Sequence, residues 1–346
     1  MLYFFWEREV DMKNMKLHLL TGILIGAYTC SAFAANSTPQ GVSSSPASLI
    51  TKADIPQVVT GLYSDANGYL DIAQAFILIN SGSSSTSNCP YAYYDNKANK
   101  LYLMSDAGSW QGGYAPGSVA TIENSSVVLN CLKTVISVAG TTITINWNFR
   151  FKERFSGRQY VYLAANDRAS AYSGWRVCSN VIIDSVAPTG SFTINSNAKY
   201  SNQLTVTLRL SLTDSSSGLD TMQFSNDGLT WTMAEPYATT KNWKLNSGDG
   251  QKIVYVKVSD KAGNASTAIA KSILLDMTPP NIVITSPIDR SFVNTPNKSV
   301  QYTCDGTAKS RVVMLTEGIN TVTIQDNDAA GNVGSASIQV TLDTVT

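Results

Sequence analysis

The chain has 346 residues, which is too long for one typical domain and suits two or three. Charged residues make up only 14% of it, and 25 basic residues balance 25 acidic ones. A neutral chain without a basic stripe lacks the charge that phosphate backbones attract, so we expect no nucleic-acid partner.

Residues 1–34 have the pattern of an export signal. Lys13 and Lys16 precede an apolar run over residues 17–28, and Ala32-Phe33-Ala34 supplies a small-x-small cleavage site. The run is shorter than the about 20 residues that cross a bilayer, so cleavage is favoured over a retained anchor. We therefore expect a secreted or cell-surface protein with no membrane span after cleavage.

The acidic residues ahead of the basic pair do not suit a signal peptide, which favours a translation start at Met12 or Met15. Cleavage would also remove the single histidine, His18. The remaining chain then could not build a Ser-His-Asp or Cys-His site, nor a zinc site that needs imidazole. The sequence thus predicts a protein that is not an enzyme.

Residues 35–49 are mostly Ser, Pro, Gly and Asn, and this composition predicts a flexible linker. The remainder shows short strands with period-2 alternation and frequent turn residues, which is typical of β-sandwiches. We expect three of them, at 50–185, 186–277 and 278–346. Each contains a row of alternating apolar residues that should face inward. The rows are Ile143, Ile145, Trp147, Phe149 and Phe151 in the first sandwich, Leu204, Val206, Leu208, Leu210 and Leu212 in the second, and Ile338, Val340 and Leu342 in the third.

Two short sequence motifs repeat along the chain and indicate an array of modules. An acidic residue followed by proline marks seams at residues 184–188 and 276–280, and Asp343 begins a third seam at residues 343–346. An Asp-x-Ala-Gly-Asn turn occurs at residues 260–264 and 328–332. Because the chain stops on residues that resemble the start of the earlier seams, we expect a truncated reading frame.

Residues 184–276 resemble a bacterial immunoglobulin-like domain of the kind repeated in secreted and cell-surface proteins. The resemblance rests on Met-Gln-Phe-Ser-Asn-Asp-Gly at 222–228, Glu-Pro-Tyr-Ala at 235–238 and the strand and turn at 254–264. Residues 277–346 resemble a smaller variant, and residues 50–185 are more distantly similar to a domain that precedes such repeats. The resemblance implies tandem immunoglobulin-like β-sandwiches that serve as stalks, adhesin repeats or accessory modules, and it brings no catalytic residues.

The carboxylates near the seams suggest calcium, which prefers oxygen ligands at 2.3–2.6 Å. The alternative, which we favour, is that the Asp and Asn side chains only cap tight turns. The candidate ligands form two sets, one of Asp260, Asn264 and Asp276, the other of Asp328, Asn332 and Asp343 with Asp326 nearby.

The cysteines of the first module allow one disulfide in an oxidising compartment. We prefer a bond between Cys89 and Cys131 with Cys178 left over, although three cysteines allow three pairings. Cys304 shares the parity of Val300 and Tyr302, which predicts a small buried hydrophobic residue.

Aromatic residues crowd the first module, and exposed rings could stack on sugar faces. Trp110, Tyr114 and Trp175 are the candidate ligand-binding residues. Core packing and cross-strand pairing are the commoner uses of such residues in sheets, and we favour them. A surface glycan or a protein of a host or neighbouring cell would be the partner.

Together these features predict a non-catalytic, modular extracellular protein that acts as a spacer or adhesion stalk at the bacterial cell surface. The alternative is a set of carbohydrate-binding accessory modules belonging to a larger secreted enzyme.

Overall fold

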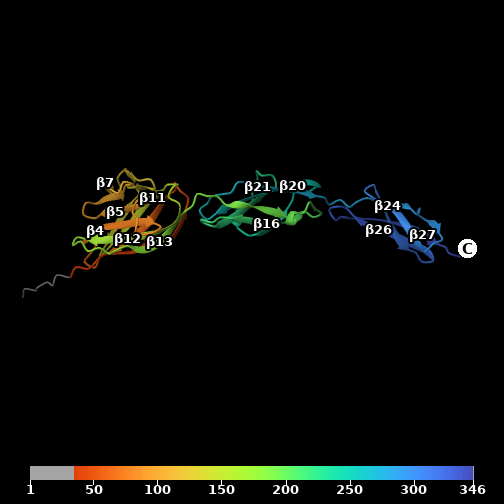
Figure 1. The fold of residues 1–346 in the computed structure, drawn as a ribbon, viewed down its shortest axis with the longest axis horizontal. Helices are drawn as coiled ribbons and strands as arrows, with labels where there is room; N and C mark the ends of the chain where they lie inside the picture. The colour runs from red at the N-terminus through yellow and green to blue at the C-terminus, as the bar shows by residue number, and fades with distance from the viewer. Residues whose placement is uncertain (1–34, 346) are drawn as a thin grey trace, which may run out of the picture. The chain divides into compact units, whose positions relative to one another are not determined.

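The computed structural model describes residues 35–345, so the expected signal region at 1–34 lies outside the described residues. Apart from one 3-10 turn, η1 (Asn195–Asn197), the elements of the described chain are all β-strands (Figure 1). Residues 35–345 include no helix with the length and hydropathy of a membrane span. The predicted all-β fold is therefore confirmed.

The strands form three β-sandwiches in tandem, each with two sheets and its own hydrophobic core. Their strands span residues 40–183, 189–275 and 282–342. The predicted inward row of the first sandwich is confirmed, because Trp147, Phe149 and Phe151 are all fully buried. The third core is the smallest, as expected for a module of about 60 residues.

The first sandwich packs a six-stranded sheet on a seven-stranded one. The first sheet contains β1 (Gln40–Ser45), β3 (Pro56–Ser64), β8 (Thr121–Glu123), β9 (Val127–Asn130), β10 (Val135–Ala139) and β11 (Thr142–Phe151). The second contains β2 (Ser48–Thr51), β13 (Arg176–Ile183), β12 (Gly157–Asp167), β4 (Ile72–Asn80), β5 (Tyr91–Asp95), β6 (Lys100–Met104) and β7 (Trp110–Tyr114), in that spatial order.

The second and third sandwiches are smaller versions of the same plan. The second pairs β14 (Thr189–Ile194), β16 (Thr205–Thr213) and β19 (Thr240–Lys244) in one sheet, and β15 (Tyr200–Ser201), β21 (Ile269–Leu275), β20 (Gly250–Asp260), β17 (Leu219–Ser225) and β18 (Glu235–Pro236) in the other. The third pairs β22 (Ile282–Ser286), β24 (Asn297–Cys304) and β25 (Thr307–Met314), then β23 (Ser291–Val293), β27 (Val333–Leu342) and β26 (Gly318–Asn327).

All three sandwiches begin in the same way, with an opening segment divided between the two sheets. Its first part pairs antiparallel in one sheet, as β1 with β3, β14 with β16 and β22 with β24. Its second part pairs parallel with the last strand of the module, as β2 with β13, β15 with β21 and β23 with β27. This shared pairing shows that the first sandwich follows the same immunoglobulin-like scheme as the other two.

The prediction of a flexible linker at residues 35–49 is wrong, because β1 and the start of β2 lie within this segment. Small side chains allow this: a Cβ on Gly41 would lie only 2.6 Å from the Cβ of Leu163, so β1 needs glycine to pack there. The strands are held by backbone pairing with β3 and β13 rather than by large apolar side chains.

The expected Cys89–Cys131 disulfide is also corrected, since both residues are free thiols in the structure, as are Cys178 and Cys304. Burial raises the pKa of the Cys89 thiol to about 12 and that of Cys131 to about 11. Both thiols therefore stay protonated at neutral pH and pack as small core residues. Cys304 is buried, as its parity predicts.

An ion pair in the third sandwich gives a pH-dependent prediction. The Asp326 carboxylate accepts hydrogen bonds from Lys309 Nζ at 2.6 Å and Tyr302 Oη at 3.0 Å. Lys309 first, and then the Asn327 N–H, lower the pKa of Asp326 from 3.8 to about 2. A lowered folded-state pKa contributes stability above the unfolded pKa, and this stability is lost as the pH falls from about 4 to about 2.

We expect Asp326→Asn to destabilise the third sandwich at pH 6, and this effect to shrink steadily as the pH falls from about 4 to about 2. Hydrogen exchange of the β24 and β25 amides, measured across this range, checks the expectation. An equal difference between the two proteins at every pH would contradict it.

Candidate functional site

Each seam aspartate extends the parallel pairing that closes the sandwich before it. Its backbone N–H donates to the carbonyl of the residue that ends the short parallel strand. The three bonds are Asp184 to Thr51 at 2.9 Å, Asp276 to Ser201 at 2.9 Å and Asp343 to Val293 at 3.0 Å. The side chain of each aspartate also accepts a hydrogen bond from the backbone N–H two residues later, which belongs to Val186, Thr278 and Val345 respectively.

The Asp-x-Ala-Gly-Asn turn connects each seam to the following sandwich. Asn264 donates its backbone N–H to Asp260 Oδ1 at 2.7 Å and its side-chain Nδ2 to Asp260 Oδ2 at 2.8 Å. The same Nδ2 donates to the Asp184 carbonyl at 3.0 Å. The favoured prediction that these residues cap a tight turn agrees with these bonds, and Gly263 supplies the positive φ of 87° that the turn requires.

The second turn repeats these contacts one module later. Asn332 Nδ2 donates to Asp328 Oδ2 and to the Asp276 carbonyl, both at 2.8 Å, and its N–H donates to Asp328 Oδ1 at 2.9 Å. Each Asn therefore bridges its own turn to the seam that precedes its sandwich.

Each predicted ligand set was therefore assigned to the wrong seam: its turn residues lie at the preceding seam. Asp260 and Asn264 lie with Asp184 rather than with Asp276, and Asp328 and Asn332 lie with Asp276. The reason is strand direction: Gly250 at the start of β20 pairs with Leu275 at the end of β21. The far end of β20, which carries Asp260, therefore lies where the chain enters the sandwich. Asp326 instead pairs with Lys309.

Three carboxylates converge at the first seam. One oxygen each from Asp184, Asp214 and Asp260 lies within 4.8 Å of the others, and Asp184 and Asp260 are almost fully buried. The N–H of Ser217 donates to Asp184 Oδ2 at 3.0 Å and to Asp214 Oδ1 at 2.9 Å. Asp214 was not among the expected ligands, and no local motif distinguishes it from an ordinary turn residue. Among residues 35–345 the second seam has no such group of three.

A second feature is an aromatic face on the outer side of the seven-stranded sheet. Its rings alternate with buried residues such as Ala75 and Ile77, so they point away from the core. The face consists of Phe76 on β4, Tyr91 and Tyr93 on β5, Tyr102 on β6, Trp110 on β7, and Tyr172 and Trp175 between β12 and β13.

Phe76 contacts the most rings of the face, and Trp110 packs against two of its tyrosines. Trp110 meets Tyr93 edge-to-face with centroids 4.5 Å apart and Tyr91 with centroids 4.7 Å apart. Tyr93 stacks on Tyr102 at 4.7 Å, and Tyr91 packs against Trp175 at 5.6 Å. The cluster is firmly packed, yet Trp110 keeps 38% of its surface exposed.

The expected ligand-binding set is brought together only in part, because Tyr114 lies on the other face of β7. A register shift lets Tyr102 pair with Gly112 while Leu101 pairs with Tyr114. Leu101 is a core residue, so its cross-strand partner Tyr114 projects from the inner face. Tyr114 is exposed there, away from Trp110.

Polar side chains border the aromatic face. Gln74 on β4 pairs with Asp95 on β5, in the same register parity as the Phe76–Tyr93 pair. Asn166 on β12 donates its Nδ2 to Gln74 Oε1 at 3.0 Å. Amide and carboxylate groups beside exposed rings could hydrogen-bond a ligand that stacks on the rings.

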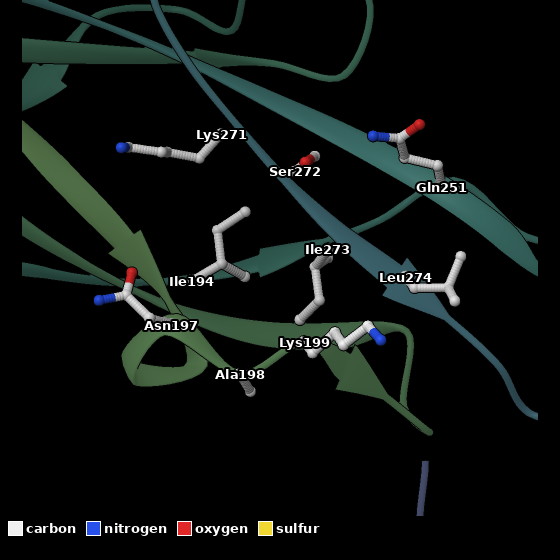
Figure 2. A pocket seen from close by; sticks show the side chains of 9 residues that line it. All are labelled: Ile194, Asn197, Ala198, Lys199, Gln251, Lys271, Ser272, Ile273 and Leu274. Atoms are coloured by element: carbon white, nitrogen blue, oxygen red, sulfur yellow. The ribbon is translucent and has the colours of Figure 1, made fainter. Parts of the chain in front are cut away.

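The hollow shown in Figure 2 lies between η1 and β21 in the second sandwich. Its floor includes the buried Ile194 and Ile273, and Lys199 and Lys271 stand at its edge. The side chains lining it include no carboxylate, imidazole or thiol, so it offers no acid, base or nucleophile of those kinds.

No family model matches the chain, and no curated protein matches it. Among solved structures, the fibronectin(III)-like modules of Clostridium thermocellum CbhA align at 13% identity over 68% of this chain and 93% of that one, with a TM-score of 0.27. The mouse nectin-like molecule 4 ectodomain (Ig1–Ig3) aligns at 10% identity over 84% and 86%, with a TM-score of 0.28.

Extracellular domains 3–5 of Drosophila OTK align at 11% identity over 89% of this chain and 99% of that one, with a TM-score of 0.22. Scores this low carry no conclusion about function. The immunoglobulin-like character of this chain rests on its own strand pairing, and the resemblance to bacterial repeats stays a prediction.

Proposed function

We propose that this chain is a non-catalytic, extracellular modular protein in which the tandem sandwiches act as a spacer or adhesion stalk. The observation that carries the proposal is the repeated seam. Asp184 is bonded through its N–H to Thr51 of the first sandwich and through its carbonyl to Asn264 of the second. Asp276 is bonded in the same way to Ser201 and Asn332.

A spacer needs junctions that resist bending, and a peptide group bonded on both sides provides such a junction. Asp184 is buried at the first seam, and Asp276 is half-buried at the second. Asp249 strengthens the second seam, because its carboxylate accepts from the Met277 N–H at 2.9 Å and from the Thr278 hydroxyl at 2.5 Å. These bonds involve backbone and short side chains, so they add stiffness without a large apolar interface.

The spacer proposal predicts that Asn264→Ala together with Asn332→Ala loosens both seams, because two carbonyls lose their donors. Small-angle X-ray scattering of the purified chain should then show a broader distribution of interatomic distances than for the parent. Asn281→Ala, which leaves both turns intact, serves as control. Identical scattering from the parent and the double variant would sink the idea that these bonds fix the modules.

We also propose that the first seam binds calcium through Asp184, Asp214 and Asp260. Their oxygens lie within 4.8 Å of one another, which fits around one ion with calcium–oxygen distances of about 2.3–2.6 Å. The second seam lacks the third carboxylate within the described chain, so we do not extend the proposal to Asp276, Asp328 or Asp343.

Calcium at millimolar concentration should raise the melting temperature of the second sandwich, and EDTA should reverse the rise. Asp214→Asn should abolish it, because the variant keeps the turn geometry but removes one charge. Calorimetry with protection of the β20 amides reports the transition. A calcium-dependent rise that survives in Asp214→Asn would contradict this assignment.

A second candidate function is glycan binding by the first sandwich, and the aromatic face is the observation that favours it. Trp110 and Tyr172 expose 38% and 51% of their surfaces beside the polar side chains of Gln74 and Asp95. Rings with large apolar surfaces stack on the C–H faces of sugars, and amides and carboxylates bind hydroxyls. In this case the partner is a surface glycan, and the other sandwiches present the binding module.

The glycan proposal predicts that the purified chain binds a subset of a glycan array and that Trp110→Ala weakens this binding by about tenfold or more. Tyr114→Ala is the matched control, because it removes an exposed ring from the same strand but from the other face. Both variants should remain folded at the assay temperature, although Trp110→Ala loses two ring contacts and should melt below the parent. Binding that is equally lost in Tyr114→Ala, or a blank array with a folded protein, would refute the assignment.

A further inference from the structure

Three carboxylates that lie outside the seams come together in the first sandwich. One oxygen each from Asp65, Asp71 and Asp167 lies within 4.8 Å of the others. Asp65 and Asp167 are each only 2% exposed, and Asp71 is half-buried. Such grouping of acidic side chains away from water is costly unless positive charge compensates it.

Strand pairing explains how the chain brings these residues together. Asp65 follows β3 in one sheet, whereas Asp71 precedes β4 and Asp167 ends β12 in the other. Asp167 is opposite Ile72 across a register shift at Asn166, and such a shift changes the direction of the side chain. The N–H of Arg168 donates to the Asp71 carbonyl at 2.9 Å, which ties the two strand ends together.

The loop between Asp65 and Asp71 is fixed by its own backbone. The Asp65 N–H donates to the Thr141 carbonyl at 2.9 Å, and the Tyr69 N–H donates to the Gly140 carbonyl at 3.1 Å. Gly68 adopts a φ of 111° and donates to the Asp65 carbonyl at 3.0 Å. The carboxylates of Asp65 and Asp71 therefore belong to a loop that is anchored to the β10–β11 hairpin.

The Asp65 side chain carries an unused acceptor. Its Oδ1 accepts from the Asn67 N–H at 2.8 Å and from Ser37 Oγ at 3.0 Å. Its Oδ2 is buried and has no hydrogen-bond partner among the residues that the structure describes. A buried carboxylate oxygen without a donor is unfavourable, and the Asp65 side chain lies within a group of carboxylates.

We propose that Asp65, Asp71 and Asp167 bind a calcium ion in the first sandwich. Oxygens on one calcium can lie up to about 5 Å apart, twice the calcium–oxygen distance, and the observed limit of 4.8 Å falls within this range. The ion gives Asp65 Oδ2 its partner and offsets the negative charge of the three side chains. It also joins the end of β3 in one sheet to the ends of β4 and β12 in the other.

The competing explanation is a proton shared between two of the carboxyl groups, with Arg168 supplying the remaining positive charge. Asp65→Asn separates the two. The Asn Oδ1 can still accept from the Asn67 N–H, and its Nδ2 can donate to a neighbouring carboxylate. The variant therefore keeps the loop, mimics the protonated state and removes a ligand charge.

Isothermal titration of the EDTA-stripped chain with CaCl2 tests the proposal. Asp214→Asn is used as the background, so that binding at the first seam is not counted. We expect this variant to retain a calcium site and Asp65→Asn in the same background to weaken it by about 100-fold or more. Asp95→Asn, in the same sandwich but outside the cluster, should bind as the background does.

Hydrogen exchange and thermal melting add readouts that do not depend on titration heats. Calcium should slow exchange of the β3 and β4 amides in the background protein and not in Asp65→Asn, which should be at least as stable as the background in EDTA. Absence of calcium binding at millimolar concentration, unchanged affinity in Asp65→Asn, or equal binding of MgCl2 would each overturn the proposal. A stabilised Asp65→Asn protein with no calcium effect in the background would assign the cluster to the shared proton instead.

Discussion

The peptide units that flank Asp184 and Asp276 are hydrogen-bonded to two sandwiches at once, and both junctions depend on this constraint. The N–H of Asp184 continues the β2–β13 pairing, and its carbonyl accepts from Asn264. Because each peptide unit is planar, only rotation about the bonds of the Asp184 Cα separates the two contacts. The Asp184 side chain also accepts from the Val186 N–H, which restricts that rotation. The first seam is therefore a short element held by several hydrogen bonds, and the Asn of the Asp-x-Ala-Gly-Asn turn supplies the bond from the second sandwich.

Local patterns in the sequence predicted the features that depend on neighbouring residues. Period-2 alternation identified the buried row from Ile143 to Phe151, since side chains of a strand alternate between faces whatever its partners are. Turn residues identified the cap at Asp260 and Asn264 for the same reason. The Ser- and Gly-rich stretch before residue 50 was wrongly predicted as a linker, because β1 is stabilised by pairing with β3 and by close approach to Leu163, which composition does not reveal.

Features that depend on strand direction and register could not be predicted in this way. The seam partner of Asn264 follows from the antiparallel course of β20, and the position of Tyr114 follows from a one-residue shift at Gly112. The set of Asp65, Asp71 and Asp167 spans about a hundred positions and requires both sheets to be in place. Short-range motifs therefore located the modules and their turns, whereas the candidate sites arise from long-range pairing.

The two carboxylate clusters differ in how much of their charge the protein itself compensates. At an effective dielectric constant of about 20, two unit charges 4.8 Å apart repel by roughly 3 kcal/mol, so each cluster carries a substantial cost. At the seam, backbone N–H groups of Val186, Ser217 and Asn264 donate to the carboxylates. In the first sandwich, the N–H groups of Asn67 and Ala171 and the Ser37 hydroxyl donate to the carboxylates, but the buried Asp65 Oδ2 has no hydrogen-bond partner among the described residues. The seam can thus form without an ion and be tightened by one, whereas the first sandwich leaves one buried carboxylate oxygen that a cation would satisfy.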